Sequence, residues 1–356
     1  MIEIDGSQGE GGGQVLRTAL TLSMITGQAF RISNIRANRP KPGLMRQHLA
    51  SVKAAAAISG ARVTGDVLGS TSLEFAPGAI RAGEYEFTIG TAGSCTLVLQ
   101  TVVPALLYAG GESVVRVSGG THNSKAPPAE FLQRAYGRAL AAMGAQVEFK
   151  LERAGFYPAG GGAVRASVQP LQGWRTLALE ARGERREAYA ESMVAAVPAG
   201  VARRELDCVA SSMGWSGEQL RFQTLPDSWG PGNALLVTLD HEHVTEVFVA
   251  FGEKARRAEE VARDAVAQAR RYIASGAAVS EHLADQLLVP MALAGGGSFT
   301  VDVVSQHTRT NAEVIARFLP VSVTFEKRAS SSYCEVRQNG SAALKPSAQL
   351  RPGAPS

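Results

Sequence analysis

The order of apolar and polar positions divides most of the chain into short helices and strands. Residues 16–40, 97–123 and 283–311 share one pattern: an apolar helix, a glycine, a strand of alternating polarity and a polar loop. A glycine after a helix is typical of a left-handed helix cap, and the alternation is typical of a strand with one buried face. Because the pattern occurs three times, it predicts an internal repeat.

Each copy continues with a second helix and one or two strands, and a leading strand precedes at least the first two copies. The glycines Gly27 and Gly111 are 84 residues apart, whereas Gly111 and Gly296 are 185 residues apart. The surplus of 101 residues predicts an insertion between the second and third copies. We assign it to residues 184–275, whose pattern indicates a self-contained β-α-β-β-β-α unit.

These patterns predict an α/β (α+β) protein with two domains. A large domain comprises residues 1–183 and 276–337 and contains the three repeated units, and residues 184–275 form a small inserted domain. Residues 338–356 are polar and rich in proline, glycine and serine. Such a segment cannot bury enough apolar surface to fold, so we predict a disordered tail.

Polar side chains recur at equivalent positions of the repeat helices. Counting back ten residues from a glycine at the end of each helix gives Arg17, Gln100 and Asp285, which we place in the first helical turns. The loops after the repeat strands carry Arg36, Arg39, residues 121–125, His307 and Arg309. Equivalent positions of a repeat converge on one face, and helix N-termini favour anions, so these residues predict an anion-binding site. Ordinary solvent-exposed positions are the alternative.

The glycine-rich loop of residues 6–14 lies between a short strand and the first apolar helix. Its glycines would let the backbone approach a ligand closely. The loop lacks the lysine of a phosphate-binding P-loop, and it contains Glu10, which repels a phosphate unless a divalent cation lies between them. Glu10 is therefore a candidate metal ligand, and a tight structural turn is the alternative.

Three further groups have possible chemistry. His307 could act as a base or as a nucleophile through a ring nitrogen, or could be a loop histidine with structural contacts only. Cys95 stands near a helix start, where a thiolate is stabilised, but a small packed side chain is the favoured interpretation. The Asp-His-Glu-His run of residues 240–243 is interpreted as a hairpin turn rather than a metal site, because the sequence offers no third ligand.

Composition adds constraints on partners and compartment. The net charge of +4 permits a polyanionic partner and fits a solvated basic surface equally well. Only seven of the 36 basic residues are lysines, and the guanidinium group of arginine suits phosphate. The three cysteines are distant and form no CxxC pair, no targeting signal is apparent, and no apolar stretch is long enough to span a membrane. We therefore expect a cytoplasmic protein with reduced cysteines.

Eight stretches stand in order between residues 5 and 320: DGSQGEGGGQVLR, RANRPKPGLMRQHL, GTAGSCTLVLQTVVPAL, GGTHNSKAPPAEF, GFYPAGGG, GEK, HLADQLLVPMALAG and HTRTNAEVIARFLP. Together they resemble the RNA 3′-terminal phosphate cyclase family. The set is specific, although each stretch alone is not. The glycine signature of that family begins with Arg or His where this chain has Ala154.

The resemblance implies three βαβαββ-type repeats with a thioredoxin-like insert. It also implies a reaction in which ATP adenylates a histidine and AMP then passes to an RNA 3′-phosphate, giving RNA(3′)pp(5′)A. The neighbouring 2′-hydroxyl displaces AMP and leaves a 2′,3′-cyclic phosphate. In this chain His307 matches the nucleophile, and Glu10 matches the acid associated with a divalent cation, Mg²⁺ or Mn²⁺.

The resemblance further implies the residues that bind the substrates. The matching ATP positions are Gln100, Pro127, Phe131, His282, Leu283, Ala284, Asp285 and Gln286. Arg17, Arg36 and Arg39 are expected to grip phosphates of ATP or of the RNA end. RNA with a 3′-phosphate is the expected partner, and the oligomeric state is not indicated by the sequence.

Three other functions stay open at this point. A non-catalytic cyclase-like protein that assists ribosome assembly is one, although such relatives lack the histidine that His307 provides. An enolpyruvyl transferase uses related repeats and basic loops, but it would need neither the insert nor His307. A plain RNA-binding module is supported only by the basic charge.

Overall fold

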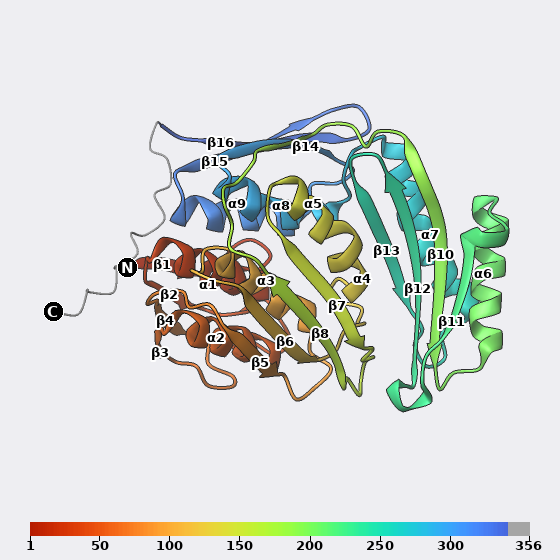
Figure 1. Cartoon of the computed structure of the whole chain (residues 1–356), viewed down its shortest axis with the longest axis horizontal. Coiled ribbons are helices and arrows are strands. Elements are labelled where there is room, and N and C mark those ends of the chain that lie inside the picture. The colour runs from red at the N-terminus through yellow and green to blue at the C-terminus, as the bar shows by residue number, and fades with distance from the viewer. Residues whose placement is uncertain (341–356) are drawn as a thin grey trace.

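The fold was analysed in a computed structural model, which describes residues 1–340 (Figure 1). Its first sheet has the strand order β1-β2-β4-β3, with β1 parallel to β2 and the other neighbours antiparallel. The elements of this part are β1 (Ile2–Asp5), α1 (Gly13–Thr26), β2 (Phe30–Ser33), α2 (Arg46–Ser59), β3 (Arg62–Thr64) and β4 (Leu73–Ala76).

The second sheet has the order β5-β6-β8-β7 and the same pattern of strand directions. A π-helical turn, Leu132–Tyr136, joins its two short α-helices into one helical segment. The elements are β5 (Glu84–Thr88), α3 (Cys95–Leu106), β6 (Ser113–Gly119), α4 (Ala129–Phe131), α5 (Gly137–Ala142), β7 (Val147–Arg153) and β8 (Gly162–Val168).

The third sheet again has this arrangement, with the order β9-β14-β16-β15. Its elements are β9 (Leu177–Leu179), α8 (Glu281–Leu293), β14 (Gly296–Val301), α9 (Gln306–Phe318), β15 (Val321–Lys327) and β16 (Ser332–Gln338). Each of the three sheets therefore contains the strand of one of the three segments that were aligned in the sequence. The mixed α/β class expected from the sequence is confirmed.

We had expected the insertion to lie between the second and third copies of the repeat. In the structure it lies inside the third copy. Strand β9 pairs in parallel with β14, so the leading strand of the third sheet precedes the insert. A strand of three residues carries too little periodicity to be recognised in the sequence. The boundaries of the two domains stay a prediction.

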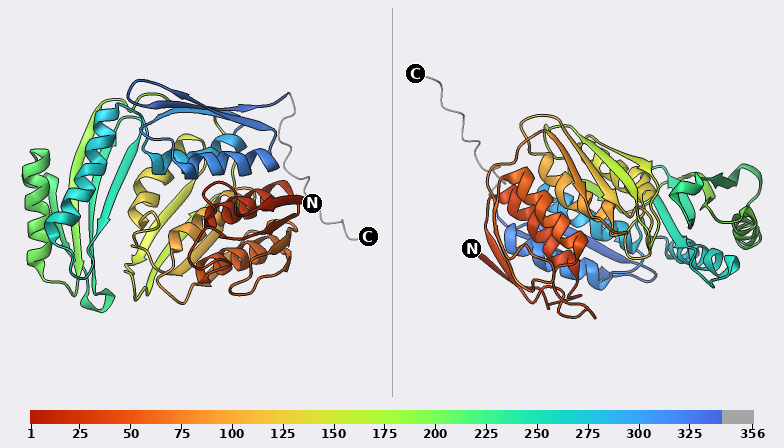
Figure 2. Two further views of the ribbon diagram at one scale, coloured as in Figure 1. Left: turned by 180° about the vertical axis from the view of Figure 1, so that it is seen from behind. Right: turned by 90° about the horizontal axis from the view of Figure 1, so that it is seen from below.

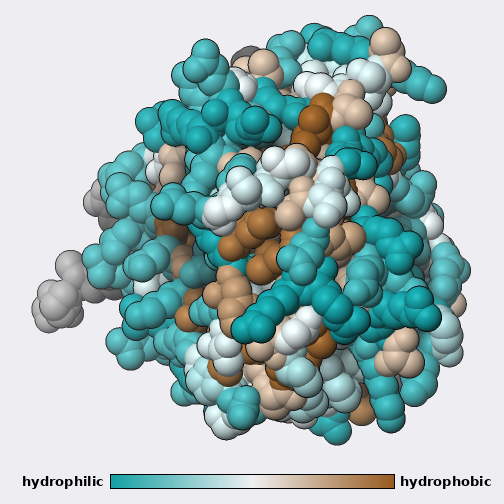
Figure 3. Space-filling view, turned by 90° about the vertical axis from the view of Figure 1, so that its right-hand side faces the viewer, coloured by the Kyte–Doolittle hydropathy of each residue, from teal (hydrophilic) through white to brown (hydrophobic). Residues whose placement is uncertain are grey.

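The insert contains the predicted order of four strands and two helices. They are β10 (Arg185–Ala195), α6 (Ala199–Met213), β11 (Leu220–Thr224), β12 (Gly232–His241), β13 (Thr245–Phe251) and α7 (Ala258–Ser275). The sheet order is β11-β10-β12-β13, and helices α6 and α7 pack together beside it with their own apolar core (Figure 1). The outer face of the insert is mostly hydrophilic, with a small apolar area at its centre (Figure 3).

The helices that belong to the other three sheets meet in the interior, and these sheets cover them from outside (Figure 2). Helix α1 contacts α2, α3 and α9, and α8 contacts α9. Strands such as β2 and β6 alternate between buried and less buried residues, because one face packs on the helices and the other faces solvent. This arrangement brings the N-terminal halves of α1, α8 and α9 close together.

Two local expectations change. Gly27 and Gly295 adopt the left-handed conformation, with φ of 71° and 79°. Gly110 has no positive φ, because α3 already ends at Leu106 and the chain continues in turns.

The tail was expected to start at residue 338, but Gln338 is the last residue of strand β16. The rest of the predicted tail, residues 341–356, lies outside the described residues.

Candidate active site

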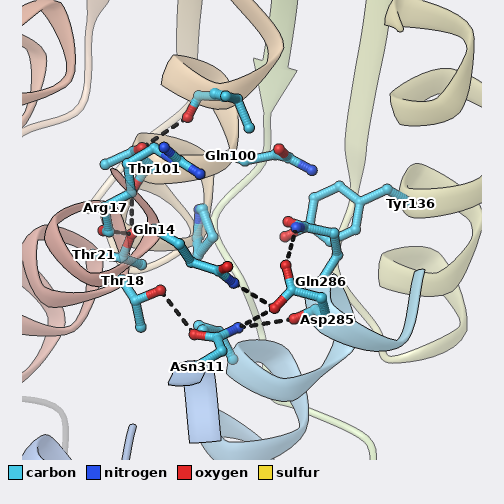
Figure 4. A pocket seen from close by; sticks show the side chains of 13 residues that line it. Gln14, Arg17, Thr18, Thr21, Gln100, Thr101, Tyr136, Asp285, Gln286 and Asn311 are labelled. Atoms are coloured by element: carbon cyan, nitrogen blue, oxygen red, sulfur yellow. Dashed lines mark hydrogen bonds between the residues drawn. The ribbon is translucent and has the colours of Figure 1, made fainter. Parts of the chain in front are cut away.

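A cavity lies where α1, α3 and α8 converge (Figure 4). Its wall combines polar and apolar side chains. They are Gln14, Arg17, Thr18, Thr21, Leu97, Gln100, Thr101, Pro104, Tyr136, Asp285, Gln286, Val289 and Asn311.

The three equivalent polar residues of the repeat helices meet at this cavity. Arg17, Gln100 and Asp285 all line it. They stand in the second helical turns, not in the first as expected, because α1, α3 and α8 begin at Gly13, Cys95 and Glu281. The three residues therefore converge as expected, one helical turn later than expected, and their role in binding an anion stays a prediction.

Gln100 presents a side-chain amide without a partner. Both polar atoms of the amide are buried, and neither forms a hydrogen bond with any residue that the structure describes. A buried amide without partners costs about 1–3 kcal/mol, so such a group at a cavity wall indicates a site for a hydrogen-bonding ligand. This is the observation that most directly connects the cavity to a ligand.

Asp285 is the centre of a buried polar network (Figure 4). Gln286 Nε2 donates to its Oδ2 at 2.8 Å, Asn311 Nδ2 donates to its Oδ1 at 3.1 Å, and Gln14 Nε2 also donates to Oδ1. Burial raises the pKa of Asp285, and these amide donors oppose the shift. Since every contact comes from an N–H group, the carboxyl group acts as an acceptor only.

Arg17 supplies positive charge to the cavity. Burial lowers its pKa to about 10, and the charge of Asp285 opposes that shift. The guanidinium group is therefore still charged at neutral pH. A half-buried cation of this kind attracts an anionic ligand more strongly than an exposed one does, because solvent screens it less.

His307 lies in the first turn of a helix and not in a loop as the sequence suggested. Helix α9 begins at Gln306, and the Ser305 side chain caps it by accepting a hydrogen bond from Thr308 N. The polar run SQHTRTN is therefore a capped helix start. Because the N-terminus of a helix carries partial positive charge, this position favours phosphate groups near the histidine.

The ring of His307 is held from one side only. Nδ1 lies 2.8 Å from Gln14 Oε1 and 3.6 Å from Glu10 Oε2. The side chain is 53% exposed, and no described residue forms a hydrogen bond with Nε2. Partial burial lowers the pKa of His307, and Arg17 and Arg39 act in the same direction, against Asp285. The imidazole is therefore mostly neutral at pH 7 and has a free ring nitrogen.

The glycine-rich loop packs against this histidine. A side chain at Gly12 would collide with the carboxylate of Glu10, and one at Gly13 would collide with the His48 ring. Glycine at these two positions thus lets Glu10 and His48 approach the start of α1. Glu10 N donates to Thr310 Oγ1 at 2.9 Å, which ties the loop to α9.

Glu10 lies between Arg39 and His307. It forms an ion pair with Arg39 and is 11% exposed. No group of three or more His, Cys, Asp or Glu side chains with metal-binding geometry occurs among residues 1–340. One carboxylate fits Mg²⁺ or Mn²⁺ only when phosphates supply the other ligands, which is how magnesium is usually bound beside a nucleotide.

The remaining predicted site residues have different surroundings. Arg36 NH1 donates to the carbonyls of Lys41 and Gly43, so its guanidinium group holds its own loop together. Phe131, Leu283 and Ala284 are buried in the core, Pro127 O accepts a hydrogen bond from Thr96, and His282 is exposed. None of these six residues lines the cavity, whereas Gln286 does.

Two groups that the sequence analysis had doubted are indeed unsuited to chemistry. Cys95 is fully buried, and burial raises the pKa of its thiol to about 12. Residues Glu242 and His243 form the turn between β12 and β13, as expected. All three cysteines are free. No helix among residues 1–340 has the length and apolar character needed to cross a membrane.

Sequence reasoning missed several residues of the site. Gln14, Asn311 and Tyr136 line the cavity but were given no role, because their contacts come from distant parts of the chain. The hydrogen bond from Thr18 Oγ1 to Asn311 Oδ1, for example, joins residues 293 positions apart at a distance of 2.8 Å. Gln14 and Asn311 lie inside the quoted stretches, whereas no sequence signal pointed to Tyr136.

Charge is distributed unevenly between the insert and the rest of the chain. Residues 184–275 contain 11 basic and 14 acidic side chains, which leaves 25 basic and 18 acidic ones elsewhere. The insert is thus weakly acidic, with a net charge of −3, and the part with the cavity carries +7. A polyanion is attracted to the latter part.

Comparison with known proteins agrees with these features. Residues 8–325 match the family model described as RNA 3′-terminal phosphate cyclase. A protein of that name from Ralstonia nicotianae is 55% identical over 339 residues, which cover 95% of this chain and 97% of the relative. Namesakes from Salmonella paratyphi C and Koribacter versatilis are 53% and 52% identical, covering 92% and 90% of this chain and 94% and 91% of the relatives. The chain belongs to the RNA 3′-terminal phosphate cyclase family.

Proposed function

We propose that this protein uses ATP to convert an RNA 3′-terminal phosphate into a 2′,3′-cyclic phosphate through a covalent histidinyl-AMP intermediate. The observation that carries the proposal is the state of His307. Its ring is neutral at pH 7, held through Nδ1 and free at Nε2, and it stands at a helix N-terminus beside the cavity. A neutral imidazole nitrogen without a partner is a nucleophile.

In the first step, the lone pair of His307 Nε2 forms a bond with the α-phosphorus of ATP. The bond between that phosphorus and the oxygen that bridges to the β-phosphate breaks, and pyrophosphate leaves. Negative charge grows on the phosphate oxygens during this displacement, and nearby cations stabilise it. Arg17 in the cavity wall and Arg39 beside Glu10 both act electrostatically on His307 and would supply this positive charge.

In the second step, an oxygen of the RNA 3′-phosphate attacks the same phosphorus and the bond to Nε2 breaks, which gives RNA(3′)pp(5′)A. In the third step, the 2′-hydroxyl loses its proton and attacks the RNA phosphorus. The bond to AMP breaks, and AMP leaves. Because the third step requires a 2′-hydroxyl, the productive substrate is RNA and not DNA.

A divalent cation would assist by neutralising charge on the triphosphate. Glu10 would hold it together with phosphate oxygens, since one carboxylate completes such a site only with the nucleotide. The ion pair with Arg39 would then have to open, so Arg39 would be released to a phosphate. Gln100 would use its unpartnered amide for the nucleotide.

The proposal is tested with an RNA oligonucleotide that ends in a labelled 3′-phosphate. With ATP and Mg²⁺ or Mn²⁺, the label should become resistant to phosphatase. An oligonucleotide whose last nucleotide lacks the 2′-hydroxyl is the control, because it should stop at the adenylated end. If the RNA end stays sensitive to phosphatase at every metal and ATP concentration, the protein is a binding protein of this family rather than a cyclase.

A further inference from the structure

We infer that Gln14 is a positioning residue that fixes the tautomer of His307, and that Asp285 in turn fixes the orientation of Gln14. The inference rests on the proposed function, because it concerns the same nucleophile. Gln14 is 7% exposed and is the second residue of α1, a position that no sequence pattern connected with catalysis.

The orientation of the Gln14 amide follows from the chemistry of its neighbours. Asp285 offers only oxygens, so the Gln14 group that faces it must be the NH₂ group. The carbonyl oxygen Oε1 then necessarily faces His307 Nδ1, at 2.8 Å. An amide oxygen accepts hydrogen bonds and cannot donate one, so Nδ1 must carry the proton.

The carboxylate that orients Gln14 is itself held firmly. Asn311 Nδ2 donates to both the backbone oxygen of Asp285, at 2.9 Å, and its side chain, at 3.1 Å. The orientation of Asn311 is fixed because its Oδ1 accepts a hydrogen bond from Thr18. The carboxylate of Asp285, the amide of Asn311 and the hydroxyl group of Thr18 thus determine which way the Gln14 amide points, and the network crosses from α1 to α8 and α9 (Figure 4).

The consequence concerns reactivity and not binding. A neutral imidazole exchanges its proton between the two nitrogens, and only the tautomer with the proton on Nδ1 has a lone pair on the exposed Nε2. The Gln14 carbonyl selects that tautomer and holds the ring plane. Because this partner is an amide, it selects the tautomer and stabilises the unreactive protonated imidazolium less than a carboxylate in the same place would.

The test uses two variants of Gln14 and one matched control. In Gln14→Leu the acceptor is lost, and in Gln14→Glu an acceptor of the same shape carries a negative charge. Gln28→Leu is the control, because Gln28 Nε2 donates to Phe318 O at 3.0 Å and so joins the segment after α1 to the last residue of α9, at the end away from His307. Each variant is assayed for protein labelling by α-labelled ATP, and the ring nitrogens of His307 are observed by NMR with labelled histidine.

We expect Gln14→Leu to lower the maximal labelling rate by about 10- to 100-fold, with the KM for ATP nearly unchanged. Its His307 resonances should show a mixture of tautomers, whereas the wild type and Gln28→Leu should show the proton on Nδ1. In Gln14→Glu a carboxyl oxygen replaces the NH₂ group that donates to Asp285, so the two carboxyl groups must share a proton and the orientation is no longer fixed. The labelling rate should therefore fall although an acceptor for Nδ1 remains.

Two results would overturn the inference: wild-type His307 with its proton on Nε2, or Gln14→Leu with both a wild-type labelling rate and wild-type resonances. The NMR measurement separates this inference from the proposed function. Suppose that the wild type takes no label, but that the single tautomer of its His307 becomes a mixture in Gln14→Leu. The positioning role of Gln14 is then supported, while the proposed nucleotidyl transfer fails.

Discussion

His307 and His122 are two histidines with opposite surroundings in the same fold. His307 stands at the start of α9 with its side chain 53% exposed and one ring nitrogen bonded. The His122 side chain is fully buried, and both its nitrogens are bonded, Nδ1 to Thr121 at 2.8 Å and Nε2 to Glu130 at 3.0 Å. The ring also stacks on Phe156, with the centroids 5.1 Å apart.

The comparison shows what distinguishes a reactive histidine from a structural one. Both residues belong to polar stretches that follow a repeat strand, and both have a carboxylate nearby, so residue type and position alone do not separate them. The number of bonded ring nitrogens does separate them. Both nitrogens of His122 are bonded, so the ring has no lone pair for a substrate, and its bonds instead join the loop to α4.

The largest contrast is expected in covalent labelling by α-labelled ATP. His307→Asn removes the nucleophile, so labelling should fall by at least about 10⁴-fold. His122→Asn should retain labelling per folded molecule, because His122 has no free nitrogen to contribute. Labelling of the two variants side by side, with the folded fraction measured by circular dichroism, checks this. Loss of label in His122→Asn with an intact fold would show that His122 also takes part in the labelling reaction.

The reverse contrast is expected in stability. His122→Asn leaves Glu130 buried without its partner, and breaking a buried pair in this way costs about 3–5 kcal/mol. His307→Asn removes one hydrogen bond of a half-exposed ring and should change the free energy of unfolding by no more than about 1 kcal/mol. Urea unfolding at neutral pH measures both. Equal effects of the two substitutions would show that His307 also has a structural role.

A third histidine sharpens the comparison through pH. His48 is buried beside Arg17, its Nδ1 accepts a hydrogen bond from Met45 N at 3.2 Å, and burial first, then the charges of Arg17 and Arg36, lower its pKa from 6.5 to about 3. The unfolded chain takes up a proton near pH 6.5, but the folded chain does not. Stability from the neutral ring is therefore complete above pH 6.5 and is lost as the pH falls towards 3.

His48→Gln should remove part of this loss, because glutamine does not titrate and can accept the same hydrogen bond. Between about pH 7 and pH 4.5, the free energy of unfolding of the variant should fall by about 2–3 kcal/mol less than that of the wild type. Urea unfolding at the two pH values provides the measurement. Parallel losses in both proteins would mean that His48 is protonated in the folded state.

The sequence predicted the larger features of the molecule because they depend on local periodicity. The repeated helix and strand patterns, the insert order and the meeting of Arg17, Gln100 and Asp285 could all be expected from spacing. Two local features were missed. The strand β9 is too short to show a pattern, and the polar start of α9 has the composition of a loop until Ser305 is recognised as its cap.

The contacts that make His307 reactive could not be predicted in this way. Gln14 lies 293 positions from His307 and 271 from Asp285, and nothing in a single sequence links such residues. The side chains of Phe131 and Leu283 lie in the core, so their assignment to a nucleotide site, which rests on the resemblance to a family, stays a prediction. Burial and pairing are properties of the fold, and they decide which polar residues are free for a ligand.

The most direct test of the account is to locate the adenylate on the protein. The protein is incubated with ATP and Mg²⁺ or Mn²⁺, kept at alkaline pH to preserve a phosphoramidate, digested and analysed by mass spectrometry. The account predicts a single AMP on the peptide that contains His307, linked through Nε2 and released by acid. An acid-stable adenylate, or one on a lysine or on another histidine, would contradict the assignment of His307 as the nucleophile.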